Sequence, residues 1–496
     1  DDPSINNEDC IAFGEYESIS SQSEIVRPYS AVKSLGAPAS KVAVGEGVWI
    51  RGRVAAIRQK GKSCFLVIRS DSFYTIQACH FVDKEHKEAS QELLKFLSTL
   101  NLESIVDIYG SLQSASVKSC SQDNVEIHLK KIYVVSKAPP VLPFLLEDAA
   151  RPNDIIEASQ NTPRPFAAVA QDVRLNNRWL DLRVPANNAI MRIRSGILKH
   201  FRDSLYDDSF VEINTPKLIA GASEGGADVF KTDYFGMMAC LAQSPQLYKQ
   251  MAISSDLKRV FEIGPVFRAE KSNTRRHLCE FTGLDMEMEI ESHYNEALTV
   301  VHNVFRRIFS MLESDYRLEL DIIRAQYDSK KVEITEDPLI IHWKDGIQML
   351  RDAGHEAGDF DDLTSAQELQ LGAIVKEKFK SDFFILDQYP SNIRPFYTML
   401  NPEDTRYSNS YDMFLCGQEI CSGAQRCHDP TLLEAAIVRK GIDPEPLKFY
   451  IDCFRHGISP HAGAGIGLDR VVFLYLGLDN VRKGSMFPRD PSRCVP

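Results

Sequence analysis

Residues 461–470 alternate glycine with small or apolar residues, and an apolar run follows directly at 471–474. Glycine at this density suggests a dinucleotide-binding loop. However, the spacing is GxGxG rather than GxGxxG, and fewer than about 30 residues remain for the rest of a βαβ unit. The segment therefore predicts a glycine-rich strand that leads into a buried helix. Arg470, in the first turn of that helix, is a cation suited to a phosphate group.

A second segment predicts a β-hairpin. Residues 261–267 are mainly apolar, and a polar loop separates them from residues 284–290, where apolar and acidic side chains alternate with the period of a strand. A surface hairpin held by salt bridges would also explain the alternating charges. It would not explain the many basic and hydrogen-bonding groups of the loop 271–277. The side chains expected on the open face are Arg268, Glu270, Glu280 and Phe281.

The region before the hairpin predicts a helix followed by a strand. Apolar residues recur at helical spacing between residues 190 and 205, and the extended run 210–215 is stopped by Pro216. From there to the end of the sequence, strands and helices mix without a repeating βαβ rhythm. We therefore expect an α+β domain that is built on an antiparallel sheet and flanked by helices.

Residues 45–137 have a different texture, with five short strand-like runs and a helical stretch before the fourth. This pattern fits a small closed barrel of the OB type, and such barrels often bind single-stranded nucleic acid. An SH3-like or purely structural barrel remains an alternative. The segment carries 13 Lys and Arg against 10 Asp and Glu, in a chain of net charge −12.

The remaining sequence sets the domain limits. A chain of 496 residues exceeds one compact core. We expect a loosely structured polar leader at 1–44, the barrel at 45–137, a proline-rich linker or hinge at 138–175 and a second domain at 176–496. No signal peptide and no membrane span are expected. The eleven cysteines are scattered and never spaced CxxC, so we expect reduced thiols and no structural zinc site.

Taken in order, these segments resemble the three signature motifs of class II aminoacyl-tRNA synthetases: the dimer-interface proline (Pro216), the arginine-bearing hairpin and the glycine-rich strand with its arginine-bearing helix. The barrel placed first is similar to the aspartyl, asparaginyl and lysyl subgroup. Further segments resemble the aspartyl enzymes of eukaryotic cytosolic type, namely 223–227, 243–250, 409–412, 417–426 and 486–490.

The resemblance implies ATP-dependent attachment of L-aspartate to the 3′ end of tRNA-Asp through an aspartyl-adenylate, by a cytoplasmic homodimer that uses ATP and Mg²⁺. Positioning and cations would do most of the catalysis, without a protein nucleophile. Arg268 would act on the α-phosphate and Arg470 on the γ-phosphate, while Phe281 would stack on adenine. The other residues implied in ATP binding are Glu270, Arg276, His277, Leu278, Glu419, Gly467, Leu468 and Asp469, the last standing where glutamate is usual.

The resemblance also implies how aspartate and magnesium are held. A buried carboxylate needs a charged partner, and Lys249 with Arg426 would pair that of the substrate. The other implied aspartate contacts are Glu224 to the ammonium group, Gln246, Arg268 and Ser422. Asp412 and Glu419 would complete an oxygen-only magnesium shell, although a salt-bridged acidic pair would need no metal.

In the barrel, the implied anticodon contacts are Phe65, which would stack on a base, and Gln77 and Glu126, which would read base edges. Phe65 could instead be an ordinary core residue.

Two other functions share parts of this pattern. An asparaginyl enzyme has the same fold, but a neutral substrate would leave Lys249 and Arg426 with excess positive charge. A catalytically silent RNA-binding paralogue would keep the barrel and use the old active site as scaffold. The presence of Arg268, Asp412, Glu419, Arg426 and Arg470 speaks against it.

Overall fold

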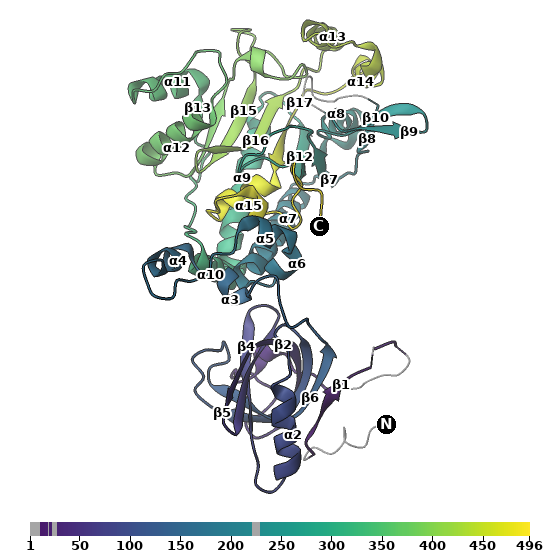
Figure 1. Ribbon diagram of the computed structural model, residues 1–496. Coiled ribbons are helices and arrows are strands. Elements are labelled where there is room, and N and C mark those ends of the chain that lie inside the picture. Colours follow the sequence, from purple (N-terminus) through teal and green to yellow (C-terminus); the bar gives the residue numbers. More distant parts are fainter. Residues whose placement is uncertain (1–9, 18, 22–26, 221–228) are drawn as a thin grey trace. The chain divides into compact units, whose positions relative to one another are not determined.

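The computed structural model describes residues 10–17, 19–21, 27–220 and 229–496. It divides into two compact units, residues 1–145 and 146–496 (Figure 1). Over the described residues, the first unit contains one sheet and the second contains a large and a small sheet. No helix of the described residues is long and apolar enough to span a membrane.

The first unit is the expected closed barrel. Over its described residues, six strands form one sheet, in which β5 closes the barrel by pairing with both β2 and β6. Alternate residues such as Leu66, Ile68 and Ile127 point inward and are fully buried, as the period of a strand requires. The elements are β1 (Ala12–Glu15), β2 (Gly47–Lys60), β3 (Ser63–Ser70), β4 (Tyr74–Phe81), α2 (Lys87–Leu97), β5 (Ile105–Ser114) and β6 (Val125–Ser136).

Parts of the expected loose leader are ordered against this barrel, which corrects that expectation. Strand β1 pairs in parallel with β6, and Val32 is in the barrel core. The buried guanidinium of Arg27 lies 4.6 Å from the ring of Trp49 and donates to Asp107 at 3.0 Å. These contacts join residues far apart in sequence, so no local pattern in the sequence predicts them.

The expected linker also contains helices: α3 (Leu146–Ala149), α4 (Asn153–Ser159) and α5 (Gln171–Asn176). Arg174 and Gln326 both donate to the carbonyl of Ala149, which fixes this stretch to the second unit. The segment is too short and polar for a helical apolar stripe, so composition alone suggested a linker.

The second unit is built on a mainly antiparallel sheet, as expected. Over the described residues, its eight strands run in the order β13-β14-β15-β16-β17-β12-β11-β7. Only the outer pairs, β13 with β14 and β7 with β11, are parallel. The strands are β7 (Val211–Glu212), β11 (Arg259–Phe267), β12 (Glu280–Glu289), β13 (Ile340–His342), β14 (Phe383–Asp387), β15 (Ser410–Leu415), β16 (Gln418–Gln425) and β17 (His461–Gly467).

Helices and a small second sheet surround this sheet in Figure 1. Helices α7, α9 and α10 pack together, and α9 and α15 contact the central strands. The helices are α6 (Arg178–Asp181), α7 (Pro185–Asp207), α8 (Gln246–Ala252), α9 (Asn295–Asp315), α10 (Arg317–Gln326), α11 (Trp343–Asp352), α12 (Ser365–Phe379), α13 (Pro430–Arg439), α14 (Lys448–Arg455) and α15 (Leu468–Tyr475). The small sheet contains β8 (Leu218–Ile219), β9 (Lys231–Tyr234) and β10 (Met237–Leu241).

The predicted hairpin and glycine-rich strand meet at the centre of the large sheet. β11 and β12 form the hairpin, and β17 pairs with β12 on one side and β16 on the other. A Cβ at Gly463 would lie 2.1 Å from a carboxylate oxygen of Glu287 and 2.3 Å from the carbonyl oxygen of Met286. Glycine is therefore needed here because a buried acidic side chain lies directly against β17.

Candidate active site

A cavity of about 400 Å³ lies over the central strands β16, β17 and β12 and the start of α15. Most of the residues implied in substrate binding line it: Gln246, Arg268, Glu270, Arg276, His277, Leu278, Phe281, Glu419, Ser422, Arg426, Gly467, Asp469 and Arg470. Lys249, Asp412 and Leu468 are not among the lining residues. Glu224 lies outside the described residues. Pro216 lies in the loop between β7 and β8, away from the cavity lining.

One end of the cavity is rich in arginine. Arg268 has no hydrogen bond or ion pair from its guanidinium to a described residue, and its central carbon lies 5.6 Å from the centre of the Phe281 ring. Arg276 donates to Glu368 at 2.7 Å, and Arg470 donates to the carbonyl of Glu419 at 3.1 Å. An uncompensated guanidinium beside two others favours an anionic ligand.

His277 lies among these cations. Burial, together with the nearby Arg470, Arg276 and Arg268, lowers the pKa of its imidazole. Its Nδ1 is 2.5 Å from Oγ1 of Thr274. A neutral imidazole can therefore offer a hydrogen bond here without adding a fourth positive charge.

Two carboxylates meet where β15 and β16 pair. Asp412 accepts a hydrogen bond from Arg394 on Oδ2 at 2.8 Å, while its buried Oδ1 has no hydrogen-bond partner among the described residues. A β-bulge opposite Met413 and Phe414 breaks the alternation of β16, which brings Glu419 to the cavity together with Ser422.

The pKa of Glu419 is raised to about 7 by burial and by the neighbouring Asp412 carboxylate. A hard divalent cation between the two groups would relieve this repulsion and would complete the hydrogen-bonding capacity of the free Asp412 oxygen. The donor set is made of oxygen alone, so it fits Mg²⁺.

The other end of the cavity contains a four-membered charge network. Arg426 pairs with both oxygens of Glu287, at 2.9 and 3.1 Å. Nζ of Lys249 lies 3.1 Å from Asp285 and 3.4 Å from Glu287. All four side chains are buried, and of the four only Asp285 and Arg426 reach the cavity. Lys249 therefore lies behind the cavity wall, paired within the protein.

The sequence missed several residues of the site. Arg394 donates to Ser422 at 3.0 Å as well as to Asp412, but nothing in its local sequence marks it. Asp285 and Glu287 were visible only as alternating charges. Asp469 accepts from Arg194 at 2.8 Å and from the backbone N–H of Thr282 at 3.0 Å. Its carboxylate is thus largely occupied within the protein.

The barrel residues share one outer face. The register places Phe65 opposite Cys79 and Gln77 opposite Glu126. Gln77 donates to Glu126 at 2.7 Å. Phe65 alternates with core residues and is not in the barrel core. Its ring meets that of Phe81 edge-on at 5.8 Å, so this face has both aromatic rings and hydrogen-bonding groups.

Comparisons with known proteins agree with both units. Residues 170–491 match the family model of class II tRNA synthetases (D, K and N), and residues 48–135 match the OB-fold nucleic acid binding domain. The chain is 50% identical over 453 residues to human cytoplasmic aspartate–tRNA ligase, covering 91% of this chain and 89% of that protein. It is 45% identical over 488 residues to the cytoplasmic aspartate–tRNA ligase of Caenorhabditis elegans, covering 98% and 90%.

Solved structures are similar over most of the chain. The aspartyl-tRNA synthetase from Entamoeba histolytica has a TM-score of 0.89 at 43% identity, covering 98% of this chain and 96% of that one. The asparaginyl-tRNA synthetase from Pyrococcus horikoshii complexed with asparaginyl-adenylate has a TM-score of 0.79 at 29% identity, covering 91% and 97%.

Proposed function

Because this chain belongs to the class II tRNA synthetases of the D, K and N group, we infer that it is an enzyme that attaches aspartate to tRNA. Relatives at 45–50% identity over nine-tenths or more of the chain are named cytoplasmic aspartate–tRNA ligases. We propose the cytoplasm as its place of action on the same ground. The observation that carries the mechanism is the guanidinium of Arg268, which has no hydrogen bond or ion pair to a described residue and faces the same cavity as the carboxylate of Glu419.

We propose ATP as the energy source. The aspartate α-carboxylate oxygen would form a bond to the α-phosphorus of ATP as the bond to pyrophosphate breaks, which gives an aspartyl-adenylate. Arg268 would stabilise the charge that develops on the α-phosphate, since it has no partner to give up among the residues that the structure describes. Arg276, His277 and Arg470 would hold the outer phosphates, and Phe281 would stack on adenine. Glu270, Leu278, Gly467, Leu468 and Asp469 would complete the ATP site.

Asp412 and Glu419 would hold Mg²⁺, which would neutralise phosphate charge. Arg394 keeps the Asp412 carboxylate oriented, because it bonds the other oxygen. Aspartate would lie toward Arg426, with Gln246 and Ser422 as further polar contacts and Lys249 acting from behind the wall. Glu224 would bind the ammonium group.

We propose tRNA-Asp as the nucleic-acid substrate. Its terminal adenosine hydroxyl would form an ester bond to the carbonyl carbon of the aspartyl-adenylate as the bond from that carbon to the phosphate oxygen breaks, which releases AMP. Its anticodon would contact Phe65, Gln77 and Glu126. We also propose a homodimer that uses the Pro216 region, as the class resemblance implies. A monomeric mass at micromolar concentration with full activity would contradict the dimer.

The decisive experiment is aspartate-dependent ATP–pyrophosphate exchange, with asparagine and lysine as competing amino acids. The proposal predicts that aspartate supports exchange, and that about a ten- to hundredfold excess of asparagine or lysine leaves the exchange rate unchanged. Exchange with asparagine instead would favour an asparaginyl enzyme. Tight tRNA binding without any exchange would favour the silent paralogue.

A further inference from the structure

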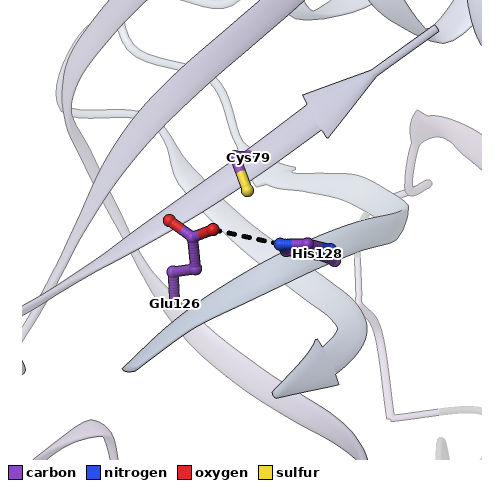
Figure 2. Close-up of side chains that lie close together, drawn as sticks. All are labelled: Cys79, Glu126 and His128. Carbon is purple, nitrogen blue, oxygen red and sulfur yellow. Dashed lines mark hydrogen bonds and ion pairs between the residues drawn. The ribbon is translucent and has the colours of Figure 1, made fainter. Parts of the chain in front are cut away.

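A mixed group of metal-binding side chains lies on the outer face of the barrel (Figure 2). The donor atoms of Cys79, Glu126 and His128 all lie within 4.8 Å of one another. β4 and β6 run in parallel there, with Cys79 opposite His128 and Gln77 opposite Glu126. Residues two apart on a strand share a face, so the register itself brings the three donors together.

The three side chains differ in exposure in a way that suits a partly open site. Cys79 is buried, the Glu126 side chain is 16% exposed and the His128 side chain is 46% exposed. Nε2 of His128 lies 3.0 Å from one oxygen of Glu126, and Gln77 donates to the other oxygen at 2.7 Å. Gln77 thus fixes the carboxylate from the side away from His128, as outer-shell groups do for metal ligands.

We propose that Cys79, Glu126 and His128 bind one Zn²⁺-class ion on this face. Sulfur, imidazole nitrogen and carboxylate oxygen are the ligands that zinc takes. Zinc–ligand lengths of about 2.0–2.3 Å require donors roughly 3.3–3.8 Å apart. The donor atoms lie within 4.8 Å of one another, and rotation of the exposed His128 ring can shorten these distances to the range that zinc requires. Cys79 would lose its thiol proton to solvent on coordination, and a water molecule would take the fourth position.

The thiol of Cys79 faces the carboxylate of Glu126, with which it also forms a hydrogen bond, and it has a long contact of 3.8 Å to the carbonyl oxygen of Ile127. The sulfur, the carboxylate and the imidazole thus converge on one point. A polar network in which the thiol only donates to Glu126 would not give thiolate-to-metal absorption, whereas a zinc site would.

The ion would change what this face can bind, and this step rests on the proposed function. Glu126 is proposed to accept a hydrogen bond from an anticodon base, and an oxygen that coordinates zinc no longer accepts one. Zinc would therefore weaken tRNA binding while leaving amino-acid activation in the other unit intact. The site would act as a reversible inhibitory site for zinc.

Direct metal binding tests the site without tRNA. The full chain, stripped of metal, is titrated with Co²⁺, whose thiolate charge-transfer absorption reports sulfur coordination. We expect one strong site whose affinity falls at least about tenfold in Cys79→Ser and in His128→Asn. The control variants are Cys120→Ser and His86→Asn, which alter a cysteine and a histidine of the same unit outside the group. Both should keep the wild-type affinity for Co²⁺. His128 is exposed, so His128→Asn remains informative even if Cys79→Ser fails to fold. If neither Cys79→Ser nor His128→Asn weakens Co²⁺ binding, the proposed site is wrong.

The second arm measures tRNA-Asp binding and ATP–pyrophosphate exchange with and without one equivalent of Zn²⁺. We expect tRNA affinity to fall about tenfold in the wild type and to stay unchanged in His128→Asn, with exchange unchanged in both. Metal binding with unaltered tRNA affinity would overturn the inhibitory role. Absence of tRNA binding without metal would count against the proposed function and leave the metal site standing.

Discussion

Arg426 and Glu287 form a two-bond ion pair that is fully internal: Nε and Nη2 of the arginine meet the two oxygens of the glutamate at 2.9 and 3.1 Å, and both side chains are buried. The arginine that the sequence assigned to the substrate carboxylate therefore already has a carboxylate partner. Its Nη1 has no hydrogen bond to a described residue, so one edge of the guanidinium remains for a ligand.

Lys249 is neutralised in the same way, which changes the physical basis of selectivity between aspartate and asparagine. Lys249, Arg426, Asp285 and Glu287 balance one another, so these four side chains leave no excess positive charge of the kind the sequence suggested for Lys249 and Arg426. The two acids, Asp285 and Glu287, differ in the direction of their pKa shifts, however. Burial raises the pKa of Asp285 in spite of Lys249, whereas Arg426 and Lys249 outweigh burial and lower the pKa of Glu287. Asp285 is thus the acid that can take up a proton at lower cost and free Lys249 for the substrate.

Replacing Arg268 tests the phosphate role. We expect Arg268→Ala to raise the barrier to adenylate formation by about 2.7–4 kcal/mol, the scale of losing one charge-stabilising donor. Because the side chain has no hydrogen bond to the described part of the chain, the melting temperature should not change. Arg306→Ala, which removes a half-exposed arginine of α9, is the matched control. Near wild-type exchange in Arg268→Ala would remove this residue from the phosphate role.

Replacing Lys249 tests both stability and selectivity. Lys249→Met leaves buried carboxylates short of a cation, so we expect the free energy of unfolding to fall by about 3–5 kcal/mol, measured in urea. Adding Asp285→Asn should restore most of that stability, because the acid left without a partner is then neutral. Lys258→Met, at an exposed lysine, should leave stability unchanged.

The same variants separate folding from recognition. In the stabilised double variant, we expect the ratio of kcat/KM for aspartate to that for asparagine to narrow. A site that pairs a polar group can reject an analogue lacking it by about 10⁴–10⁵, and one of the two cations is gone. Residual aspartate use through Arg426 is expected. An unchanged ratio with both rates high means that the carboxylate is held elsewhere.

Replacing Asp412 tests the magnesium site. Asp412→Asn keeps the shape of the side chain and removes one negative charge. We expect the Mg²⁺ concentration for half-maximal exchange to rise at least about tenfold. Glu377→Gln, at an exposed acid of α12, should not shift the magnesium curve. A curve that stays in place for Asp412→Asn would favour a salt-bridged pair that needs no metal.

His461 should make stability depend on pH. Its Nδ1 lies 2.7 Å from the carbonyl of Ser459, so it carries the proton, and its Nε2 faces the amide nitrogen of Gln250 at 2.9 Å. That amide cannot turn over freely, because its oxygen accepts from Gln246 and Tyr450. Burial is the main reason that the pKa of His461 falls from 6.5 to about 4.

Since the folded-state pKa is below the unfolded value, the unfolded chain binds the proton first as the pH falls. Stability should therefore drop between about pH 6.5 and pH 4 by up to about 1.4 kcal/mol per unit. His461→Gln should remove this part of the slope in urea unfolding measured across that range. His456→Gln, at an exposed histidine, should retain it, and equal slopes in all three proteins would contradict the assignment.

Sequence periodicity was enough to predict the main elements. The five barrel strands, the helix over α7 and the arginine-bearing hairpin carry a local pattern that indicates a strand or a helix, and α15 was expected from an unbroken apolar run. These local patterns predict the type of each element. They do not predict its partners, since β17 pairs with β12 and β16, which lie far away in sequence. The family resemblance then identified thirteen of the residues that line the cavity.

The tertiary structure alone decided which charges meet. Lys249 lies 36 residues from Asp285 in sequence, and Arg426 lies 139 from Glu287. Strand order and register, rather than any local pattern, bring these two pairs within hydrogen-bonding distance. Burial then makes each pair obligatory, because a charge removed from water must find a partner. The sequence determined the strands and the candidate groups, and the sheet determined which of those groups remain free for a ligand.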